Sequence, residues 1–192
     1  MNTIAGLRRG HNIKRLRDSW EKSQTKSDKG DVHSYLEVYD LLFAKFAQEK
    51  VSLLEIGVFN GGSLAMFKDF FQPGSEIHGI ENQTVNAALN GVAVFFGNAY
   101  TNEMLSVLGE YNIIIDDGSH TVQDVEFFVT WYLDKVKPGG LLIVEDIQPE
   151  VNQENLLKLV PEEYRKNSFF VDCKQSKGRY DDMLFVVHKA VK

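Results

Sequence analysis

Length, composition and charge are those of one soluble globular domain. The chain has 192 residues, of which 43% are hydrophobic and 25% are charged. The formal net charge of −6 argues against a nucleic-acid partner, and no run approaches the roughly 18 apolar residues of a membrane span. Cys173 is the only cysteine, which excludes a disulfide framework and favours a reducing compartment, so we expect a cytoplasmic protein.

The first 50 residues are predicted to form a helical arm that caps the active site. Apolar residues recur at helical intervals over 2–22 and 33–49, and the polar stretch 23–30 between them is predicted to be a loop. Residues 1–30 hold eight Lys and Arg against three acidic residues. A solvated helix face explains this basic arm most simply. The alternatives are contact with an acidic substrate or with a second subunit, which would give a homo-oligomer.

Strands and helices alternate after residue 50. Residues 51–192 are therefore predicted to form one compact unit, a doubly wound α/β fold whose seven-stranded sheet is mostly parallel. Ligands of such sheets bind beyond the carboxyl ends of the strands. Helices are predicted at 63–71, 102–108, 122–136 and 152–160, a turn at 137–140, and strands at 51–56, 77–80, 92–96, 113–115, 141–144, 169–171 and 183–188.

A glycine-rich turn follows the first predicted strand and opens a helix. Gly57 and Gly61 allow a ligand to approach the backbone closely, and the helix start at Ser63 offers free N–H groups. Glu81 ends the next strand, 24 residues after Gly57, where an acid can hydrogen-bond the two ribose hydroxyls of an adenosine. The pattern predicts a nucleoside-binding turn.

The same turn argues against a pyrophosphate ligand. Phe59 stands where the dinucleotide-binding motif has its second glycine, and Glu55 would repel phosphate and attract a cation. S-adenosylmethionine meets both conditions, since it carries a sulfonium, an ammonium and no phosphate. A nicotinamide-dependent dehydrogenase, which shares the fold and the ribose acid, is the alternative from another enzyme class.

Two apolar runs end in acidic residues, at Asp116-Asp117 and at Glu145-Asp146. One predicted helix separates the runs, so strand–helix–strand geometry brings the two acidic ends side by side. Carboxylates suit a hard divalent metal, and His120 nearby can act as a base. Because clustered carboxylates repel one another, we expect a metal ion to supply the compensating cation.

Several of these segments resemble class I S-adenosylmethionine-dependent methyltransferases. The larger resemblance is to the metal-dependent sugar O-methyltransferases of macrolide and rhamnosyl type, and it runs from about Ser27 to Lys189. It includes LLEIGVFNGGSL, IDDGSH paired with KPGGLLIVEDIQ, and the earlier SDKG. Gly97-Asn98 departs from the usual Gly-Asp of that family, so Asn98 is expected to contact the adenine edge with altered affinity.

The resemblance implies roles for the acidic clusters. It makes Asp117, Glu145 and Asp146 the ligands of Mg²⁺ or Mn²⁺, makes His120 the catalytic base, and places Asp116 near the methionine end of the cofactor. Lys29, His33 and Tyr39 are left open between contacts to cofactor or substrate and plain packing. The cofactor-binding residues expected in full are Glu55, Gly57, Gly61, Ser63, Glu81, Asn98 and Asp116.

The function expected from the sequence is S-adenosylmethionine- and Mg²⁺-dependent O-methylation of a hydroxyl on a sugar or glycoside. A catechol or other phenol also presents two adjacent oxygens to a metal, and it is the alternative acceptor. A non-catalytic module that binds S-adenosylmethionine is a third reading, favoured by binding without any response to Mg²⁺.

Overall fold

A single sheet forms the centre of the protein. The computed structural model describes residues 15–85 and 89–191, so the helical pattern expected over 2–14 lies outside the described residues. The strand order is β3-β2-β1-β4-β5-β7-β6, and only β7 runs antiparallel to its neighbours, which confirms a mostly parallel seven-stranded sheet. The strands are β1 (Ser52–Ile56), β2 (Glu76–Glu81), β3 (Val92–Phe96), β4 (Tyr111–Asp116), β5 (Val136–Val144), β6 (Ser168–Asp172) and β7 (Met183–His188).

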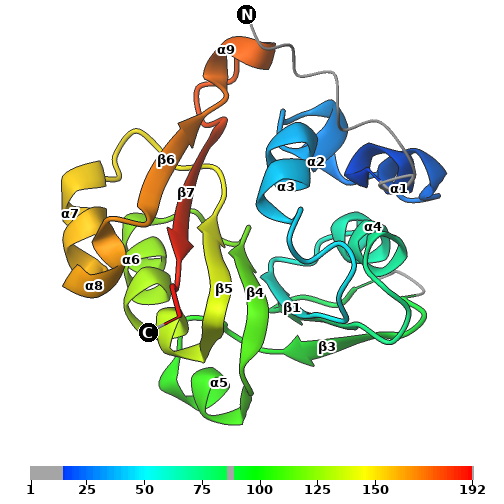
Figure 1. Ribbon diagram of the computed structural model, residues 1–192, viewed down its shortest axis with the longest axis horizontal. Helices are drawn as coiled ribbons and strands as arrows, with labels where there is room; N and C mark the ends of the chain where they lie inside the picture. Colours follow the sequence, from blue (N-terminus) through cyan, green and yellow to red (C-terminus); the bar gives the residue numbers. More distant parts are fainter. Residues whose placement is uncertain (1–14, 86–88, 192) are drawn as a thin grey trace, which may run out of the picture.

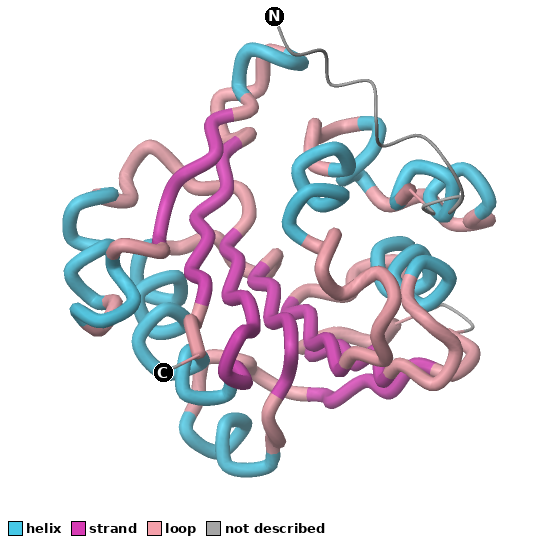
Figure 2. Tube along the Cα trace, viewed as in Figure 1, coloured by secondary structure: helices cyan, strands magenta, loops and turns pink. Residues whose placement is uncertain are grey.

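Helices cover both faces of the sheet (Figure 1). One face carries α1, α3 and α4, and the other carries α5 to α8. Figure 2 shows the helices arranged around the central strands. Their bounds are α1 (Leu16–Lys22), α2 (Asp28–Asp31), α3 (Leu36–Leu42), α4 (Gly62–Phe70), α5 (Asn102–Val107), α6 (Val122–Trp131), the 3₁₀ turn η1 (Tyr132–Lys135), α7 (Gln153–Leu159), α8 (Glu162–Arg165) and α9 (Lys174–Lys177).

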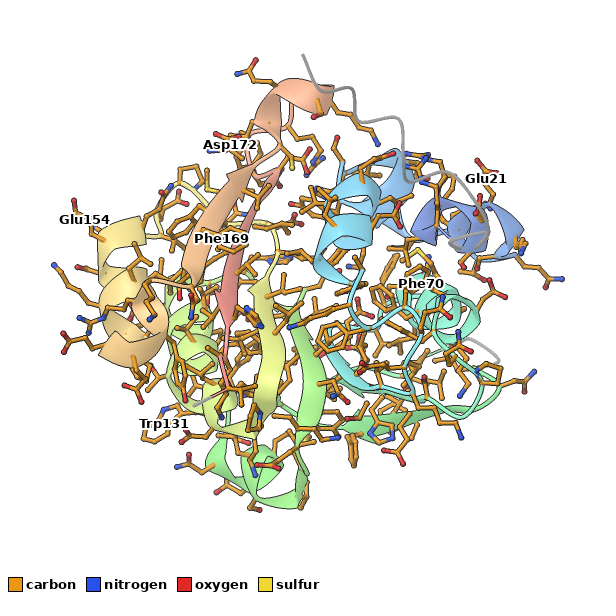
Figure 3. The ribbon with its side chains drawn as sticks, in the orientation of Figure 1. Glu21, Phe70, Trp131, Glu154, Phe169 and Asp172 are labelled. Atoms are coloured by element: carbon orange, nitrogen blue, oxygen red, sulfur yellow. The ribbon has the colours of Figure 1, made fainter. Side chains whose placement is uncertain are left out.

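Alternation along the strands builds two hydrophobic cores. In β5, Leu141 and Ile143 pack into the core that includes α4, whereas Leu142 and Val144 pack into the core that includes α6. Side chains fill the space between helices and sheet on each face (Figure 3). In the described part of the chain, no helix is long and apolar enough to cross a membrane.

The chain changes direction between β1 and β4. From β1 it runs outward through β2 to β3, then returns to place β4 on the other side of β1. Parallel pairing aligns Ile56 with Ile80 and with Asp116, so the carboxyl ends of β1, β2 and β4 lie at one edge. This switch point is where an open α/β sheet binds its ligand.

Three local predictions were wrong in detail. The predicted loop 23–30 ends in a helix, because Ser27 accepts a hydrogen bond from the Lys29 N–H and caps α2. The helix expected over 33–49 is regular only over Leu36–Leu42, and turns follow it. The predicted turn 137–140 lies within β5, at an irregularity where Tyr111 pairs with Val136 and Ile113 already pairs with Leu141.

Candidate active site

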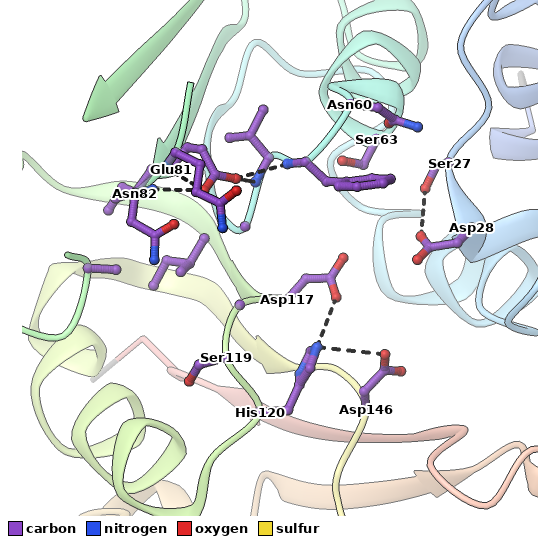
Figure 4. Close-up of a pocket in the computed structure, with 18 of the residues that line it drawn as sticks. Ser27, Asp28, Asn60, Ser63, Glu81, Asn82, Asp117, Ser119, His120 and Asp146 are labelled. Carbon is purple, nitrogen blue, oxygen red and sulfur yellow. Dashed lines mark hydrogen bonds and ion pairs between the residues drawn. The ribbon is translucent and has the colours of Figure 1, made fainter. Parts of the chain in front are cut away.

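A cavity of about 810 Å³ opens at the carboxyl ends of the parallel strands. Its wall combines the ends of β1 to β5 with residues of the N-terminal segment (Figure 4). Of the predicted site residues, the cavity is lined by Gly57, Ser63, Glu81, Asn98, Asp117, His120 and Asp146. Four others are buried and do not line it: Glu55, Gly61, Asp116 and Glu145.

The glycine turn brings β1 close to β4. Gly57 has φ of +85°, and a Cβ added there would lie 2.0 Å from the carbonyl oxygen of Asp117. Only glycine therefore allows this approach. Gly61, with φ of +75°, is the residue before α4. Phe59 has φ of +48° and is 85% exposed at the cavity, so the turn carries a bulky side chain that points away from the core.

Glu81 holds the glycine turn in place. Its Oε2 accepts hydrogen bonds from the N–H groups of Val58 and Phe59, and its Oε1 accepts from those of Asn82 and Gln83. Burial alone would raise the pKa of Glu81, but the four N–H donors outweigh it and lower the pKa. Glu81 is therefore a fixed carboxylate at the cavity wall.

Asn98 and Tyr100 order the neighbouring loop after β3. The Asn98 side-chain oxygen accepts from the Tyr100 N–H at 2.9 Å, and the Tyr100 hydroxyl donates to Asp116 Oδ1 at 2.7 Å. Burial raises the pKa of Asp116 to about 7, and the bond from Tyr100 acts in the opposite direction. Asp116 therefore does not contact the cavity itself but holds Tyr100, whose side chain lines it. No local sequence pattern predicts this contact between Tyr100 and Asp116.

Asp117, His120 and Asp146 converge on one point of the cavity (Figure 4). His120 Nε2 lies 3.8 Å from Asp117 Oδ1 and 3.9 Å from Asp146 Oδ2. One ligand atom from each of the three lies within 4.8 Å of the others, as a shared metal ion requires. His120 and Asp146 have φ of +56° and +52°, a strained conformation typical of functional sites.

A second carboxylate group lies behind the first and already contains a cation. The ammonium of Lys29 is 2.6 Å from Asp117 Oδ2, 2.8 Å from Glu145 Oε1 and 3.2 Å from Glu55 Oε1. Burial alone would lower the pKa of Lys29, but the three carboxylates raise it well above its usual value. The expectation that a metal ion supplies the compensating charge was therefore incomplete.

The N-terminal segment also holds the other acidic residues. The Tyr39 hydroxyl donates to Glu145 at 2.5 Å, and the Tyr35 hydroxyl donates to Asp146 at 2.6 Å. His33 Nδ1 lies 3.2 Å from Asp146 Oδ1. Lys29, His33 and Tyr39, whose contacts the sequence left open, thus contact the proposed metal ligands, and Tyr35 was missed.

Comparison with known proteins finds methyltransferases. The fold is that of class I methyltransferases, and residues 54–147 match a family model described as a methyltransferase domain. The matched residues include the glycine-rich turn and both acidic strand ends, which are the segments that carry the predicted motifs.

The curated relatives that the chain matches are named as O-methyltransferases. It is 32% identical over 134 residues to 8-demethyl-8-alpha-L-rhamnosyl tetracenomycin-C 2'-O-methyltransferase of Streptomyces olivaceus, covering 64% of this chain and 35% of the relative. It is 32% identical over 130 residues to demethylmacrocin O-methyltransferase of Streptomyces fradiae, covering 62% of this chain and 33% of the relative. The chain thus spans about a third of the length of these relatives.

Solved structures give the same fold. The MycE methyltransferase of the mycinamycin biosynthetic pathway, in complex with Mg and SAH, matches with a TM-score of 0.71 and 23% identity. The match covers 95% of this chain and 56% of MycE. At this identity the likeness supports the fold alone.

Proposed function

We propose that the protein is an S-adenosylmethionine- and Mg²⁺-dependent O-methyltransferase that acts on a hydroxyl of a sugar or glycoside. One observation carries the proposal. Asp117, His120 and Asp146 converge in the same cavity that the glycine turn and Glu81 line. A nucleoside-binding half and a metal-and-base half therefore face one another.

The cofactor half fits S-adenosylmethionine better than a dinucleotide. Glu81 is a fixed carboxylate that suits ribose hydroxyls, and Asn98 lies on the same wall for the adenine edge. Phe59 occupies the turn where a pyrophosphate needs a glycine. Glu55 and Asp116 do not line the cavity and are proposed to act through residues that do, because Glu55 accepts a hydrogen bond from Ser63 and Asp116 accepts one from Tyr100. Gly61 is proposed to act through the start of α4.

The metal half fits a hard divalent ion. Asp117 and Asp146 supply carboxylate oxygens on the cavity side. Glu145, the third predicted ligand, is buried beside Asp117, and its Oε1 lies 2.8 Å from the Lys29 ammonium. When bound, Mg²⁺ would polarise an acceptor hydroxyl and lower its pKa. Tyr35 and His33 hold the Asp146 carboxylate in place for that task.

His120 is the proposed base. Its side chain lies between Asp117 and Asp146 and is 27% exposed. It can therefore contact an acceptor in the cavity. It takes the hydroxyl proton as the acceptor oxygen bonds to the methyl carbon and the carbon–sulfur bond breaks. The two carboxylates stabilise the imidazolium that forms. S-adenosylhomocysteine and the methyl ether are the products.

The sugar acceptor is proposed from the relatives. Their names specify O-methylation of a rhamnosyl tetracenomycin and of mycinamicin VI, and MycE was solved with mycinamycin VI. A catechol acceptor has no comparable support. We extend the proposal to a cap function for residues up to 50 over a catalytic unit at 51–192, because the cap supplies Lys29, Tyr35 and Tyr39. The cytoplasmic location, the absence of a nucleic-acid partner and a homo-oligomer stay predictions.

Calorimetric titration with S-adenosylmethionine and NAD side by side tests the cofactor class. We expect S-adenosylmethionine and S-adenosylhomocysteine to bind with one equivalent per chain and NAD to give no heat. Binding of NAD with exclusion of S-adenosylmethionine would overturn the proposal and support the dehydrogenase.

A further inference from the structure

The connection between β6 and β7 contacts the N-terminal segment through Lys177. This lysine ends α9, which lies beyond the paired ends of β6 and β7 (Figure 1). Its ammonium donates hydrogen bonds to the carbonyl oxygens of Gly30 and Asp31, each at 3.0 Å, and to that of His33 at 2.6 Å. An ammonium has three N–H donors, which equals the number of these acceptors. Lys177 therefore binds the backbone of the N-terminal segment at three points.

The carbonyl groups that Lys177 contacts lie at the end of α2 and just after it. The last carbonyls of a helix have no partner within the helix, so they need donors from elsewhere. Lys177 donates to them although it lies 144 residues from His33 in the sequence. Asp182 extends the contact, because its Oδ1 accepts from the Ser34 N–H at 3.3 Å and lies 3.3 Å from His33 Nδ1. One connection between two strands thus contacts consecutive residues of the N-terminal segment.

Hydrophobic side chains do little to hold residues 28–34 in place. Their one aliphatic side chain is that of Val32, which is 42% exposed. The helix within them, α2, has four residues, whereas an isolated helix needs roughly 12–15 residues to be even marginally stable in water. Polar contacts therefore fix this segment, and those that Lys177 makes come from outside the candidate active site.

The same segment contributes side chains to the candidate active site. Asp28 and Asp31 line the cavity. Lys29, which lies between them in the sequence, donates hydrogen bonds to Asp117 and Glu145, two of the predicted metal ligands. A displacement of the segment would therefore change the cavity wall and the acidic strand ends together.

We propose that Lys177 is a positioning residue of the methyl-transfer reaction, which holds residues 28–34 against the acidic strand ends from outside the active site. The inference rests on the proposed function. Lys177 does not line the cavity, so it acts through the backbone of the segment that it binds. Its loss should lower turnover more than cofactor affinity, because the cofactor half of the site lies on β1 to β3.

Hydrogen–deuterium exchange of the ligand-free protein tests the contact without an acceptor. Lys177→Met removes the ammonium and keeps most of the side-chain length, so the amides of residues 30–35 should exchange at least tenfold faster than in wild type. The amides of β1 and β4 should keep their wild-type rates, which shows that the fold is intact. Lys174→Met, in the same helix, is the matched control and should exchange as wild type does. Unchanged exchange of residues 30–35 in Lys177→Met would overturn the inference.

Kinetics separate a positioning role from a contact that only stabilises the fold. With S-adenosylmethionine and a rhamnoside as substrates, Lys177→Met should lower kcat at least tenfold, while S-adenosylmethionine affinity stays within about threefold of wild type. Lys177→Arg keeps a positive charge and N–H donors, so it should recover part of kcat and part of the protection from exchange. A wild-type kcat in Lys177→Met, or a Lys177→Arg variant no better than Lys177→Met, would overturn the positioning role.

These outcomes are distinct from a failure of the proposed function. Wild type that binds S-adenosylmethionine but methylates no glycoside would overturn the proposed function, and with it the role of Lys177 in methyl transfer. The exchange rates of residues 30–35 would still decide whether Lys177 holds the segment.

Discussion

Single residues at the strand ends carry the proposed chemistry. Glu81, Asp117 and Asp146 each follow an apolar run in the sequence, so their place at the cavity could be predicted from strand periodicity alone. The residues that contact these carboxylates, such as Lys29 and Tyr35, could not be predicted in this way. Lys29 and Glu145 are 116 residues apart, and Lys29 lies in a stretch with no periodic pattern. Their contact depends on how the N-terminal segment packs on the sheet, and no local pattern in the sequence predicts that packing.

Glu81→Ala should weaken S-adenosylmethionine binding by at least tenfold. The substitution removes the proposed ribose contacts, and hydrogen bonds to a charged group contribute about 1.5–3 kcal/mol each. It also frees the N–H groups of Val58 and Phe59, so the glycine turn loses its fixed position. Calorimetric titration measures the affinity, with Glu103→Ala, an exposed acid on α5, as control. Unchanged affinity would show that Glu81 does not contact the cofactor.

His120→Asn should lower turnover by roughly 10²–10⁴, the usual range for a lost general base. Asparagine tolerates the left-handed backbone that His120 adopts, at φ of +56°, better than most residues, so the variant isolates the imidazole. Single-turnover assays with a methylatable glycoside measure the rate. S-adenosylmethionine affinity should stay within about threefold of wild type; a rate within tenfold of wild type would reduce His120 to a positioning residue.

At the scale of elements, the strands were easier to predict than the turns and the cap. Runs such as 113–115 and 183–188 are apolar because both faces of the sheet are covered, and that composition identifies a buried strand. The irregularity at 137–140 contains Pro138 and two glycines, which in a sequence indicate a turn. Pairing on both sides of it keeps these residues within β5, and pairing is a property of the neighbouring strand.

Gly57→Ala tests the turn between β1 and α4. Alanine would have to adopt φ of +85°, with its Cβ 2.0 Å from the Asp117 carbonyl oxygen, so backbone strain and displacement of the β4 end should cost about 2–5 kcal/mol. Urea unfolding measures the free energy. Gly109→Ala is the matched control, because nothing lies within 4 Å of its added Cβ, and it should change stability by no more than about 0.5 kcal/mol. Equal stability of the two variants would contradict the described turn.

In the whole molecule, the N-terminal segment contacts the ligand-binding edge of a doubly wound sheet. The outward path from β1 to β3 and the return to β4 form the switch point, and the segment from α1 to α3 contributes side chains that contact the acidic strand ends. The alternation of strands and helices predicted the sheet and its ligand edge. It did not predict that the N-terminal segment hydrogen-bonds to the acidic residues, because buried polar side chains form these bonds and such side chains follow no hydrophobic periodicity.

The proposed metal dependence can be tested at Asp146. Asp146→Ala should bind S-adenosylmethionine with unchanged affinity, since the cofactor half lies on β1 to β3, and should show at least hundredfold lower methyl transfer. The removed carboxylate also leaves Tyr35 without its acceptor. Asp134→Ala, on the 3₁₀ turn away from the cavity, is the control for a lost aspartate. Equal transfer by Asp146→Ala and wild type would remove Asp146 from the metal site.

Transfer of the labelled methyl group from S-adenosylmethionine to a glycoside, measured with and without Mg²⁺, decides whether the protein is a metal-dependent O-methyltransferase. Rhamnosides and macrolide glycosides with adjacent free hydroxyls serve as acceptors, followed by mass spectrometry of the product. We expect an O-methyl glycoside in the presence of Mg²⁺, loss of the product in excess EDTA, and recovery when Mg²⁺ or Mn²⁺ is restored. Full methylation in excess EDTA would contradict this expectation.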